Sequence, residues 1–594
     1  MGELVSDYVL GRLREWGVHR LYGYPGDGIN GFLGALDRAD GDPEFIQVRH
    51  EEMAAFMACG HAKFTGAVGV CIATSGPGAI HLLNGLYDAK LDHAPVVAIV
   101  GQQSRISLGA EYQQEVDLQT LFKDVSEFVQ MCTEPAQARH LVDRALRTAL
   151  ARRGVATLIF PNDVQEEDAV PSPPREHGAV YSSAGYTPPR IIPARTELER
   201  AAEVLNAGEK VAILVGQGAA GAVDDVIEAA ELLGAGVAKA LLGRAALPDD
   251  LPFVTGSIGL LGSRASYELM RDCDTLLMIG TNFPYAEFLP REGQARAVQI
   301  EIDPTRVGIR YPLDVQLVGD ARETLRELNP LLERNDDRSW RETVEESVEE
   351  WWRLVEDRSM MDADPINPQR VVWELSQRLP DNCILTADSG SSTNWWARQL
   401  RLRRGMLASL SGTLATMGNS VPYAIAAKFA HPERPVIAFV GDGSFQMNGM
   451  NELLTIEKYR ERWPDQRLVI CVFNNHDLNQ VTWEQRVFAG DPKYPATQQI
   501  PDFPAARYAE LVGLGGRRVE QPDDVGSAWD EALAETTPFV LEFVVDPEIP
   551  PLPPHVTVEQ AEKMAQAMVK GDPEAAGVMS KALRGKLSEF IPGR

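Results

Sequence analysis

The sequence predicts an α/β protein with three doubly wound domains, in which parallel strands alternate with helices. Short continuous apolar runs, such as VIAFV at 436–440, indicate strands that are buried on both faces. Most of these runs end at glycine-rich turns that can begin a helix. The chain has 594 residues, which is enough for three domains with separate cores. We therefore expect three parallel sheets, followed by a helical C-terminal tail.

The boundaries between these domains follow changes in composition. Residues 171–190 are rich in proline and poor in apolar residues, which is typical of a linker. Residues 345–365 are dense in Glu and Asp, which indicates a solvated helix and a connector. The predicted segments are 1–170, a linker at 171–192, 193–335, a connector at 336–366, 367–549 and a tail at 550–594.

The overall charge excludes one class of partner. There are 57 Lys and Arg against 85 Asp and Glu, which gives a net charge of −28. A nucleic-acid surface needs clustered cations, so we expect no nucleic-acid partner. The six cysteines are scattered without metal-binding spacing, which favours buried reduced thiols. Without a signal-peptide pattern or a long apolar run, the sequence predicts a cytoplasmic protein.

The first domain alternates strand and helix signals. GVHRLYGYPGDGINGFL (17–33) indicates a strand, a turn at Tyr24–Gly26 and a helix. FIQVRHEEMAAFMACGHAKFTG (45–66) indicates a short strand and a helix of small residues that begins at Glu51. Two further buried strands flank Ser75–Gly78 in residues 68–101. Acidic residues often occupy a first helical turn because of the helix dipole, so Glu51 could be structural on local grounds alone.

The central domain shows three strand-to-turn signals. Residues 210–222 end in a glycine turn, residues 273–288 contain a second strand, and residues 297–308 contain a third that ends at Asp303. Such turns can hold a nucleotide, but a glycine turn after a strand is by itself a weak signal. The framework of the fold alone would explain them.

The strongest chemical signal lies in the third domain. The run at 436–440 breaks at Gly441-Asp442-Gly443-Ser444, and a second apolar run at 468–473 ends at Asn474-Asn475. A helix from about 451 to 460 is expected between them, with residues 459–465 as a surface insertion. Parallel strands end at one edge of a sheet, so Asp442 and Asn475 should meet there.

This pair has the chemistry of a magnesium diphosphate site. Mg²⁺ prefers hard oxygen ligands, and it usually takes only one or two from protein while phosphate and water supply the rest. Glycine N–H groups at a helix N-terminus can approach an anion. An Asp-Gly turn alone would be no more than a turn, whereas the following strand that ends in two asparagines makes the pattern specific.

This combination resembles the fingerprint of thiamine diphosphate enzymes. In addition, RHE, an Ala-rich helix, SGPG, NGL and a PV strand follow one another as in the pyruvate oxidase and acetolactate synthase superfamily. The pyruvate oxidase branch is the most similar. The resemblance implies that Mg²⁺ binds Asp442, Asn475 and the backbone carbonyl of Asp477. It also implies that Glu51 hydrogen-bonds the aminopyrimidine ring of the cofactor.

A carboxyl group at this position has a chemical reason. The cofactor reacts through a carbanion at C2, and its own imino nitrogen removes the C2 proton. A carboxyl that exchanges a proton with the ring makes that imino form accessible. Glu52 is the neighbour that could be confused with Glu51, but on a helix it points about 100° away.

The resemblance assigns further residues. Those of the thiamine site are Glu51, Gln114 and Glu484 as catalytic groups and Gly26, Gly76, Ser391, Met417, Gly441, Gly443 and Ser444 as cofactor contacts. Met417 would be the wedge that bends the cofactor, although on its own it could simply fill a core. Gln113, Gln480 and Val481 should line the substrate pocket. Gln113 and Gln480 stand where relatives tend to carry Phe, which favours a 2-oxo acid larger or more polar than pyruvate.

The middle of the chain resembles the FAD domain of pyruvate oxidases through GTNFPY (280–285), IDP (302–304) and VGD (318–320). The implied contacts with FAD are Gly216, Gly218, Thr281, Asn282, Phe283, Asp303 and Asp320. In related decarboxylases this domain is degenerate or binds another nucleotide.

The resemblance also implies partners. Glu51 and Asp442 should serve one cofactor from different subunits, so a homodimer or a dimer of dimers is expected. The tail resembles that of pyruvate:quinone oxidoreductases. Its apolar residues recur at helical spacing among basic ones (Val578, Met579, Leu583, Leu587, Phe590, Ile591; Lys581, Arg584, Lys586). The tail could touch a membrane surface weakly and peripherally, or it could cap its own subunit.

The predicted function is thiamine diphosphate- and Mg²⁺-dependent decarboxylation of a 2-oxo acid. With FAD present, two electrons would pass to the flavin and then to a quinone or O₂. An acetolactate synthase-like carboligase or a non-oxidative decarboxylase is the alternative among enzymes. A nucleotide-binding relative without turnover is the alternative of a different class.

Overall fold

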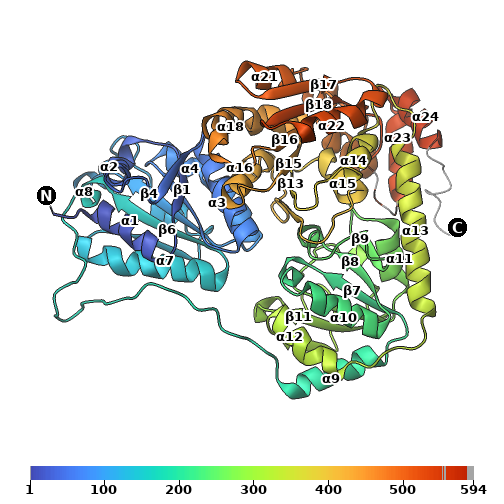
Figure 1. Cartoon of the computed structure of the whole chain (residues 1–594), viewed down its shortest axis with the longest axis horizontal. Coiled ribbons are helices and arrows are strands. Elements are labelled where there is room, and N and C mark those ends of the chain that lie inside the picture. Colours follow the sequence, from blue (N-terminus) through green and yellow to red (C-terminus); the bar gives the residue numbers. More distant parts are fainter. Residues whose placement is uncertain (1, 552, 554, 556, 585–594) are drawn as a thin grey trace.

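The computed structural model describes residues 2–551, 553, 555 and 557–584, and it contains three parallel sheets of six strands each (Figure 1). Every strand pair in these sheets is parallel. Helices connect the strands and cover both faces. The predicted fold class is therefore confirmed.

The first sheet has the strand order β2-β1-β3-β4-β6-β5. Its strands are β1 (Arg20–Gly23), β2 (Glu44–Gln47), β3 (Gly69–Ala73), β4 (Val96–Gln102), β5 (Phe128–Met131) and β6 (Val155–Pro161). The helices are α1 (Val5–Glu15), α2 (Asn30–Arg38), α3 (Glu51–Thr65), α4 (Pro77–His81), α5 (Leu83–Leu91), α6 (Leu118–Leu121), α7 (Ala138–Arg152) and α8 (Asn162–Gln165). The helix expected from Glu51 begins at that residue, and the short strand before it is β2, which ends at Gln47.

The second sheet has the order β12-β11-β10-β7-β8-β9. Its strands are β7 (Val211–Val215), β8 (Gly236–Lys239), β9 (Val254–Ser257), β10 (Thr275–Ile279), β11 (Arg296–Glu301) and β12 (Val315–Val318). The helices are α9 (Arg195–Asn206), α10 (Val223–Leu233), α11 (Arg264–Asp272) and α12 (Ala321–Leu328). The long helix α13 (Ser339–Ser359) then leads to the third domain.

The third sheet has the order β14-β13-β15-β16-β18-β17. Its strands are β13 (Ile384–Ala387), β14 (Leu407–Leu410), β15 (Val436–Gly441), β16 (Leu468–Asn474), β17 (Gly515–Val519) and β18 (Phe539–Val544). The helices are α14 (Pro368–Ser376), α15 (Ser391–Gln399), α16 (Ser420–Ala430), α17 (Asp442–Ser444), α18 (Leu453–Tyr459), α19 (Asn479–Glu484), α20 (Pro495–Gln498), α21 (Ala505–Leu511) and α22 (Val525–Ala534).

The helix expected at about 451–460 is more complex than the sequence suggested. A π-helical turn at Phe445–Gly449 and a 3₁₀ turn at Met450–Glu452 precede α18. The backbone therefore stays helical from Asp442 to Tyr459 but changes its winding three times, from α to π, to 3₁₀ and back to α. Such π turns are rare and often lie at functional sites.

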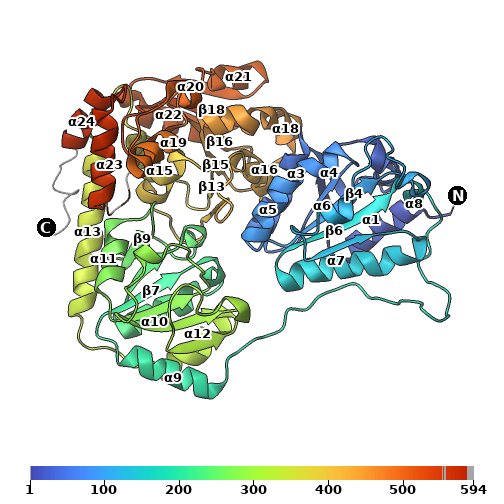
Figure 2. The same cartoon turned by 180° about the vertical axis from the view of Figure 1, so that it is seen from behind.

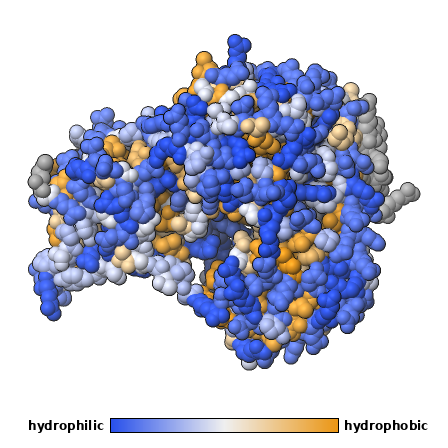
Figure 3. Space-filling model, in the orientation of Figure 1, coloured by the Kyte–Doolittle hydropathy of each residue, from blue (hydrophilic) through white to orange (hydrophobic). Residues whose placement is uncertain are grey.

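The first and third domains of one chain pack together through α3 and α16 (Figure 1), which also lie side by side in the reverse view (Figure 2). Small residues allow the close contact: a side chain added at Gly60 of α3 would lie 3.1 Å from Tyr423 of α16. Lys63 is enclosed at this interface, where its Nζ lies 2.7 Å from Oδ2 of Asp92. The residues between α8 and α9 run as an extended linker from the first to the central domain, and Figure 3 shows a hollow between these two domains.

The tail contains two helices, α23 (Val558–Val569) and α24 (Ala575–Arg584). Val578 is buried, and Nζ of Lys581 lies 2.6 Å from carboxylate oxygens of both Asp546 and Glu548. The described part of the tail therefore packs on its own chain. Leu587, Phe590, Ile591 and Lys586 of the predicted amphipathic pattern lie outside the described residues, as do the side chains of Leu583 and Arg584.

Two further predictions concern the whole chain. All six cysteines are buried and free, and all lie within the described residues, which confirms the expected thiols. Among the described helices, none combines the length and the apolar character that crossing a bilayer requires.

Candidate active site

Asp442 and Asn475 meet at the carboxyl edge of the third sheet, as predicted. In the pairing of β15 with β16, Gly441 lies opposite Phe473, so the two strands end side by side. Oδ2 of Asp442 accepts hydrogen bonds from the backbone N–H groups of Asn475 and His476, at 2.9 and 2.7 Å. Oδ1 accepts one from the N–H of Gly443 at 2.8 Å. The carboxylate is thus fixed between the two strand ends.

The donor atoms at this edge fit a hard cation. Asp442 offers a carboxylate, and the side-chain oxygen of Asn475 accepts a bond of 3.1 Å from the N–H of Asp477. Nζ of Lys493 lies 3.1 Å from the Asp477 carboxylate, which leaves the backbone carbonyl of Asp477 for the role that the resemblance implies. Burial raises the pKa of Asp442 to about 7, although three backbone N–H groups oppose the rise. A divalent cation would favour the ionised form instead.

The loop around these residues has support from behind. The side-chain amide of Asn474 donates to Asp502 and to the buried Glu542, both at 2.8 Å. Arg518 binds the same two carboxylates, and Nε2 of His476 lies 3.2 Å from Asp502. His476 has φ of 56°, a left-handed conformation that is uncommon outside glycine. This network therefore holds a backbone conformation that a free loop would rarely adopt.

The predicted diphosphate contacts surround the same edge. Ser444 is buried in the first turn after Asp442, and a side chain added at Gly443 would lie 3.5 Å from Cε of Met417. Met417 therefore lies beside the metal motif rather than deep in the core. Ser391 begins α15 after Gly390, whose φ of 130° is accessible to glycine and to few other residues.

Asp388 is a buried acid that the sequence reasoning did not assign. It follows β13, and its Oδ1 accepts a hydrogen bond of 2.8 Å from the N–H of Gly418. Burial raises its pKa to about 7, against hydrogen bonds from the backbone and from Ser444. Asp388 thus connects the end of β13 to the residue that follows Met417.

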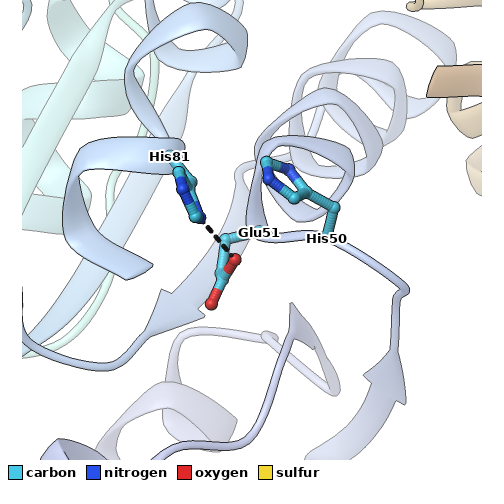
Figure 4. Close-up of side chains that lie close together, drawn as sticks. All are labelled: His50, Glu51 and His81. Atoms are coloured by element: carbon cyan, nitrogen blue, oxygen red, sulfur yellow. Dashed lines mark hydrogen bonds and ion pairs between the residues drawn. The ribbon is translucent and has the colours of Figure 1, made fainter. Parts of the chain in front are cut away.

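Glu51 lies at the N-terminus of α3 and is largely buried, with 11% of its side chain exposed. Its Oε2 lies 2.9 Å from Nδ1 of His81, at the end of α4 (Figure 4). His50 caps the same helix, and its ring lies 4.3 Å from that of His81. Polar atoms of all three side chains lie within 4.8 Å of one another. The acid is therefore oriented by an imidazole rather than free in solvent.

The glycine-rich loops of the first domain come together beside Glu51, and they contact each other at Thr74 and Ser75. Oγ1 of Thr74 accepts a hydrogen bond of 2.9 Å from Gly28 N–H. Side chains added at Gly26 and Gly78 would meet Thr74 at 2.5 and 2.7 Å, and one at Gly78 would lie 3.1 Å from Oε1 of Glu51. These glycines permit the close approach of the loops that follow β1 and β3.

Gln114 joins this group, whereas Gln113 faces outward. A side chain added at Gly76 would lie 2.8 Å from Cβ of Gln114, whose φ is 62°. Oγ of Ser75 lies 3.4 Å from Oε1 of Gln114. Gln113, by contrast, is exposed in this chain.

The predicted substrate residues on α19 form a polar pair. Nε2 of Gln480 donates to Glu484 at 2.9 Å, and Oε1 of Gln480 accepts from Asn394 of α15 at 2.9 Å. Val481 is 52% exposed. Helix α15, which begins at Ser391, therefore contacts the helix that carries Gln480 and Glu484.

The predicted FAD residues lie at the carboxyl edge of the central sheet. β7 and β10 end together, with Val215 opposite Ile279. Gly216 and Gly218 lie against Gly280: a side chain at Gly218 would meet Gly280 Cα at 2.8 Å. A surface depression of ≈ 470 Å³ lies beside Gly218 and Asp320.

The remaining central-domain residues already have partners in this chain. Thr281 and Phe283 are buried, and Asn282 accepts a bond of 3.0 Å from Arg310. Asp303 caps the turn at Thr305, and Asp320 caps α12. Capping is a sufficient structural role for both aspartates, and their contacts with FAD stay a prediction.

Comparison with known proteins decides the family. Three models of thiamine pyrophosphate enzymes match the chain: the N-terminal TPP binding domain over residues 4–121, the central domain over 198–328 and the C-terminal TPP binding domain over 388–543. These ranges follow the three sheets in order. The chain belongs to the thiamine pyrophosphate enzyme family.

Full-length relatives agree with this assignment. The thiamine pyrophosphate enzyme described here is 37% identical over 558 residues to YdaP of Bacillus subtilis, which is named as a thiamine pyrophosphate-containing protein, with 94% of each chain covered. It is 33% identical to the acetolactate synthase of Arthrospira platensis, over 90% of this chain and 92% of that one. It is 28% identical to the pyruvate oxidase of Lactiplantibacillus plantarum, over 92% and 89% of the two chains.

His81 is a residue of this thiamine pyrophosphate enzyme that the sequence reasoning missed. It lies in AIHLLNGL, six residues after the Ser75 that was singled out. A titratable residue within a mostly apolar helical stretch was the available signal. Its partner Glu51 is 30 residues away, so the contact depends on how α4, which follows β3, packs beside α3.

Proposed function

We propose that this thiamine pyrophosphate enzyme decarboxylates a 2-oxo acid with Mg²⁺ as a second cofactor, and that the reaction is oxidative, with FAD as the redox cofactor and a quinone or O₂ as the final electron acceptor. The thiamine- and Mg²⁺-dependent part of this proposal rests on two groups of residues that are already arranged in the chain. One is the oxygen-donor edge at Asp442 and Asn475, and the other is Glu51, buried and oriented by His81.

The residues of this chain have separate roles in the proposed reaction. Bound thiamine diphosphate would supply a nucleophilic carbon and an electron sink for the decarboxylation. Asp442, Asn475 and the carbonyl of Asp477 would hold Mg²⁺. Glu51 holds a proton for exchange with the cofactor ring, and the bond between His81 and its Oε2 leaves Oε1 for that exchange. Low exposure of Glu51 keeps water from competing for the same atom.

The substrate pocket includes polar groups from α19. Gln480 donates to Glu484 and accepts from Asn394, so the three side chains form an oriented polar wall. Such a wall suits a polar side group of a 2-oxo acid better than a purely apolar acyl chain. We propose pyruvate or a more polar 2-oxo acid as substrate.

The proposed role of FAD depends on the central domain. The glycines at the ends of β7 and β10 let these two loops pack closely together, and the surface depression beside Gly218 and Asp320 is where a nucleotide would lie. A flavin there would make the reaction oxidative. We also propose that two chains build each active site, with Glu51 and Asp442 from different subunits, in a homodimer or a dimer of dimers. Weak peripheral contact of the tail with a membrane stays a prediction.

Carboligation is the second candidate function. The identity to an acetolactate synthase, 33%, exceeds the 28% to a pyruvate oxidase. In that case a second carbonyl compound would form a bond to the decarboxylated fragment, and no electrons would pass to a flavin.

The flavin spectrum and the reaction products separate these functions. The purified protein should be yellow, and an anaerobic 2-oxo acid should bleach its flavin absorbance while CO₂ is released. Glu51→Gln should lose turnover but still bind the cofactor. Colourless protein that yields a hydroxyketo product would instead support carboligation, and cofactor binding without CO₂ from any 2-oxo acid would leave a binding protein.

A further inference from the structure

The strand and loop that lead to Glu51 are fastened to the third domain of the same chain. The N–H of Gln47 donates to the hydroxyl of Tyr459 at 2.8 Å, and the side chain of Gln47 accepts from Lys458 at 2.6 Å. Both partners lie at the end of α18. Two more bonds, closer to Glu51, come from the residues just before α18.

The first of these bonds is made by Glu452. Its Oε1 accepts a hydrogen bond of 2.8 Å from the backbone N–H of Arg49, two residues before Glu51. Glu452 is fully buried, and burial raises its pKa to about 7, while the Thr455 side chain, the Arg49 N–H and the Arg49 charge oppose the rise. A buried acid without a structural task would destabilise this interface. Its task is to fix the backbone where β2 turns into α3.

The second bond is made by Asn448. Its side-chain amide donates to Oε2 of Glu52 at 2.7 Å, while Asn84 donates to Oε1 of the same carboxylate at 2.6 Å. Asn448 lies in the π-helical turn, and a side chain added at Gly418 would lie 3.2 Å from it. The changed winding of this turn therefore coincides with the residue that reaches across to the first domain.

We propose that Glu452 and Asn448 are positioning residues that set the orientation of the Glu51 carboxyl in the reaction. This inference rests on the proposed function. Glu51 lies between two fastened points, the backbone at Arg49 and the side chain of Glu52. Loss of either point lets the first turn of α3 shift. A displacement of about 1 Å at a reacting group can lower a rate about 100-fold.

Glu452 and Asn448 lie in the helical stretch that begins at Asp442, a predicted metal ligand. A substitution in this stretch can therefore misplace Glu51 or damage the metal site, and the test must separate these two effects. Dissociation constants for thiamine diphosphate and Mg²⁺ report on the metal site. Exchange of the C2 proton of the bound cofactor for deuterium, followed by NMR after acid quenching, reports on the Glu51 carboxyl. A fault in positioning slows the exchange and leaves both dissociation constants nearly unchanged.

Three variants of the full-length protein provide the comparison. Glu452→Leu removes the acceptor but keeps the volume, Glu452→Gln keeps a carbonyl acceptor, and Glu457→Leu is the control. Glu457 lies on α18 and pairs with Arg460, away from residues 47–52. We expect Glu452→Leu to slow C2 exchange and kcat about 100-fold, Glu452→Gln to restore both to within about threefold, and Glu457→Leu to behave as wild type.

Several outcomes would overturn the inference. Wild-type exchange in Glu452→Leu would do so, and so would equal losses in the Leu and Gln variants or a loss of cofactor affinity parallel to the loss of rate. If Glu452→Leu does not fold, Asn448→Ala replaces it, with the same slow exchange expected and normal exchange contradicting the inference. Normal exchange in Glu51→Gln would contradict the proposed function itself, whereas slow exchange there with normal exchange in Glu452→Leu contradicts only the positioning role.

Discussion

Glu452→Gln should make the protein more stable, and more so as the pH rises. In the folded chain the pKa of Glu452 is raised from its ordinary 4.5 to about 7, because burial disfavours the charged form. The folded state therefore prefers the protonated acid, and stability falls as the pH rises through 7. Glutamine resembles the protonated acid and does not titrate, so the variant escapes this loss.

The magnitude follows from the two pKa values. The pKa of Glu452 is 4.5 in the unfolded chain and about 7 in the folded chain. This difference destabilises the folded state by about 1.4 kcal/mol at pH 5.5 and by about 3.4 kcal/mol at pH 8.5. The advantage of Glu452→Gln over wild type should therefore grow by about 2 kcal/mol across this range. Other titrating groups affect both proteins equally and cancel in the comparison.

Urea denaturation at both pH values measures this difference. A pH of 5.5 stays above the sequence pI of about 4.8, where the protein keeps a negative charge. The signal should come from the interface of the first and third domains, and a cysteine-reactive probe at Cys59 of α3 would report its opening. A constant difference between variant and wild type at both pH values would refute the reasoning, because it would mean that Glu452 keeps the same charge across the range.

Three further predictions concern other parts of the chain. Asp442→Ala should abolish the rise in melting temperature that Mg²⁺ and thiamine diphosphate give together, a stabilisation of about 2.7 kcal/mol at ligand concentrations of about 100 times Kd, and an undiminished rise would contradict the metal site. Arg486→Leu leaves the buried carboxylate of Asp572 without its bidentate partner at 2.8 Å, so the packing of the tail should lose about 3–5 kcal/mol of stability. Limited proteolysis should then cut the tail faster, and wild-type cleavage rates would show that other contacts hold it. Lys63→Met leaves Asp92 without its ion pair of 2.7 Å inside the domain interface, and urea midpoints should show a loss of about 3–5 kcal/mol, whereas a loss below about 1 kcal/mol would assign the interface to apolar packing alone.

The predicted metal site at the carboxyl edge of the third sheet could be found from the sequence because two general features of parallel sheets determine it. Continuous apolar runs locate buried parallel strands, and the ends of such strands must share an edge. Asp442 and Asn475 each follow such a run directly, so their meeting required no knowledge of side-chain packing. The observed bond of 2.9 Å between the Asp442 carboxylate and the N–H of Asn475 is the result.

The positioning residues could not be found in this way. Glu452 was inside a predicted helix, and helical periodicity says only that it lies on a buried face. Its partner Arg49 is 403 residues away in another domain. The contact depends on how α3 packs on α16 and on a π-helical turn that no propensity of the sequence announces. His81 was missed for the same reason, since its contact with Glu51 depends on tertiary packing.

Three buried acids of the third domain share one arrangement, which argues for a common purpose. Each has a pKa raised to about 7 by burial, and each accepts a hydrogen bond from the backbone N–H of a candidate-site residue or of a residue at most two positions from one. The pairs are Asp388 with Gly418, Asp442 with Asn475, and Glu452 with Arg49.

A core that served only stability would replace such acids with apolar side chains, because burial of a carboxyl is costly. A carboxyl has one property that an apolar group lacks: it can fix a loop by its backbone, whatever side chain that loop presents. The three loops fixed in this way carry Met417, Asn475 and Glu51, which are the expected wedge, metal ligand and catalytic acid. The buried acids therefore reduce the stability of the third domain and in return hold the site in one geometry, which is the arrangement expected where preorganisation matters more than stability.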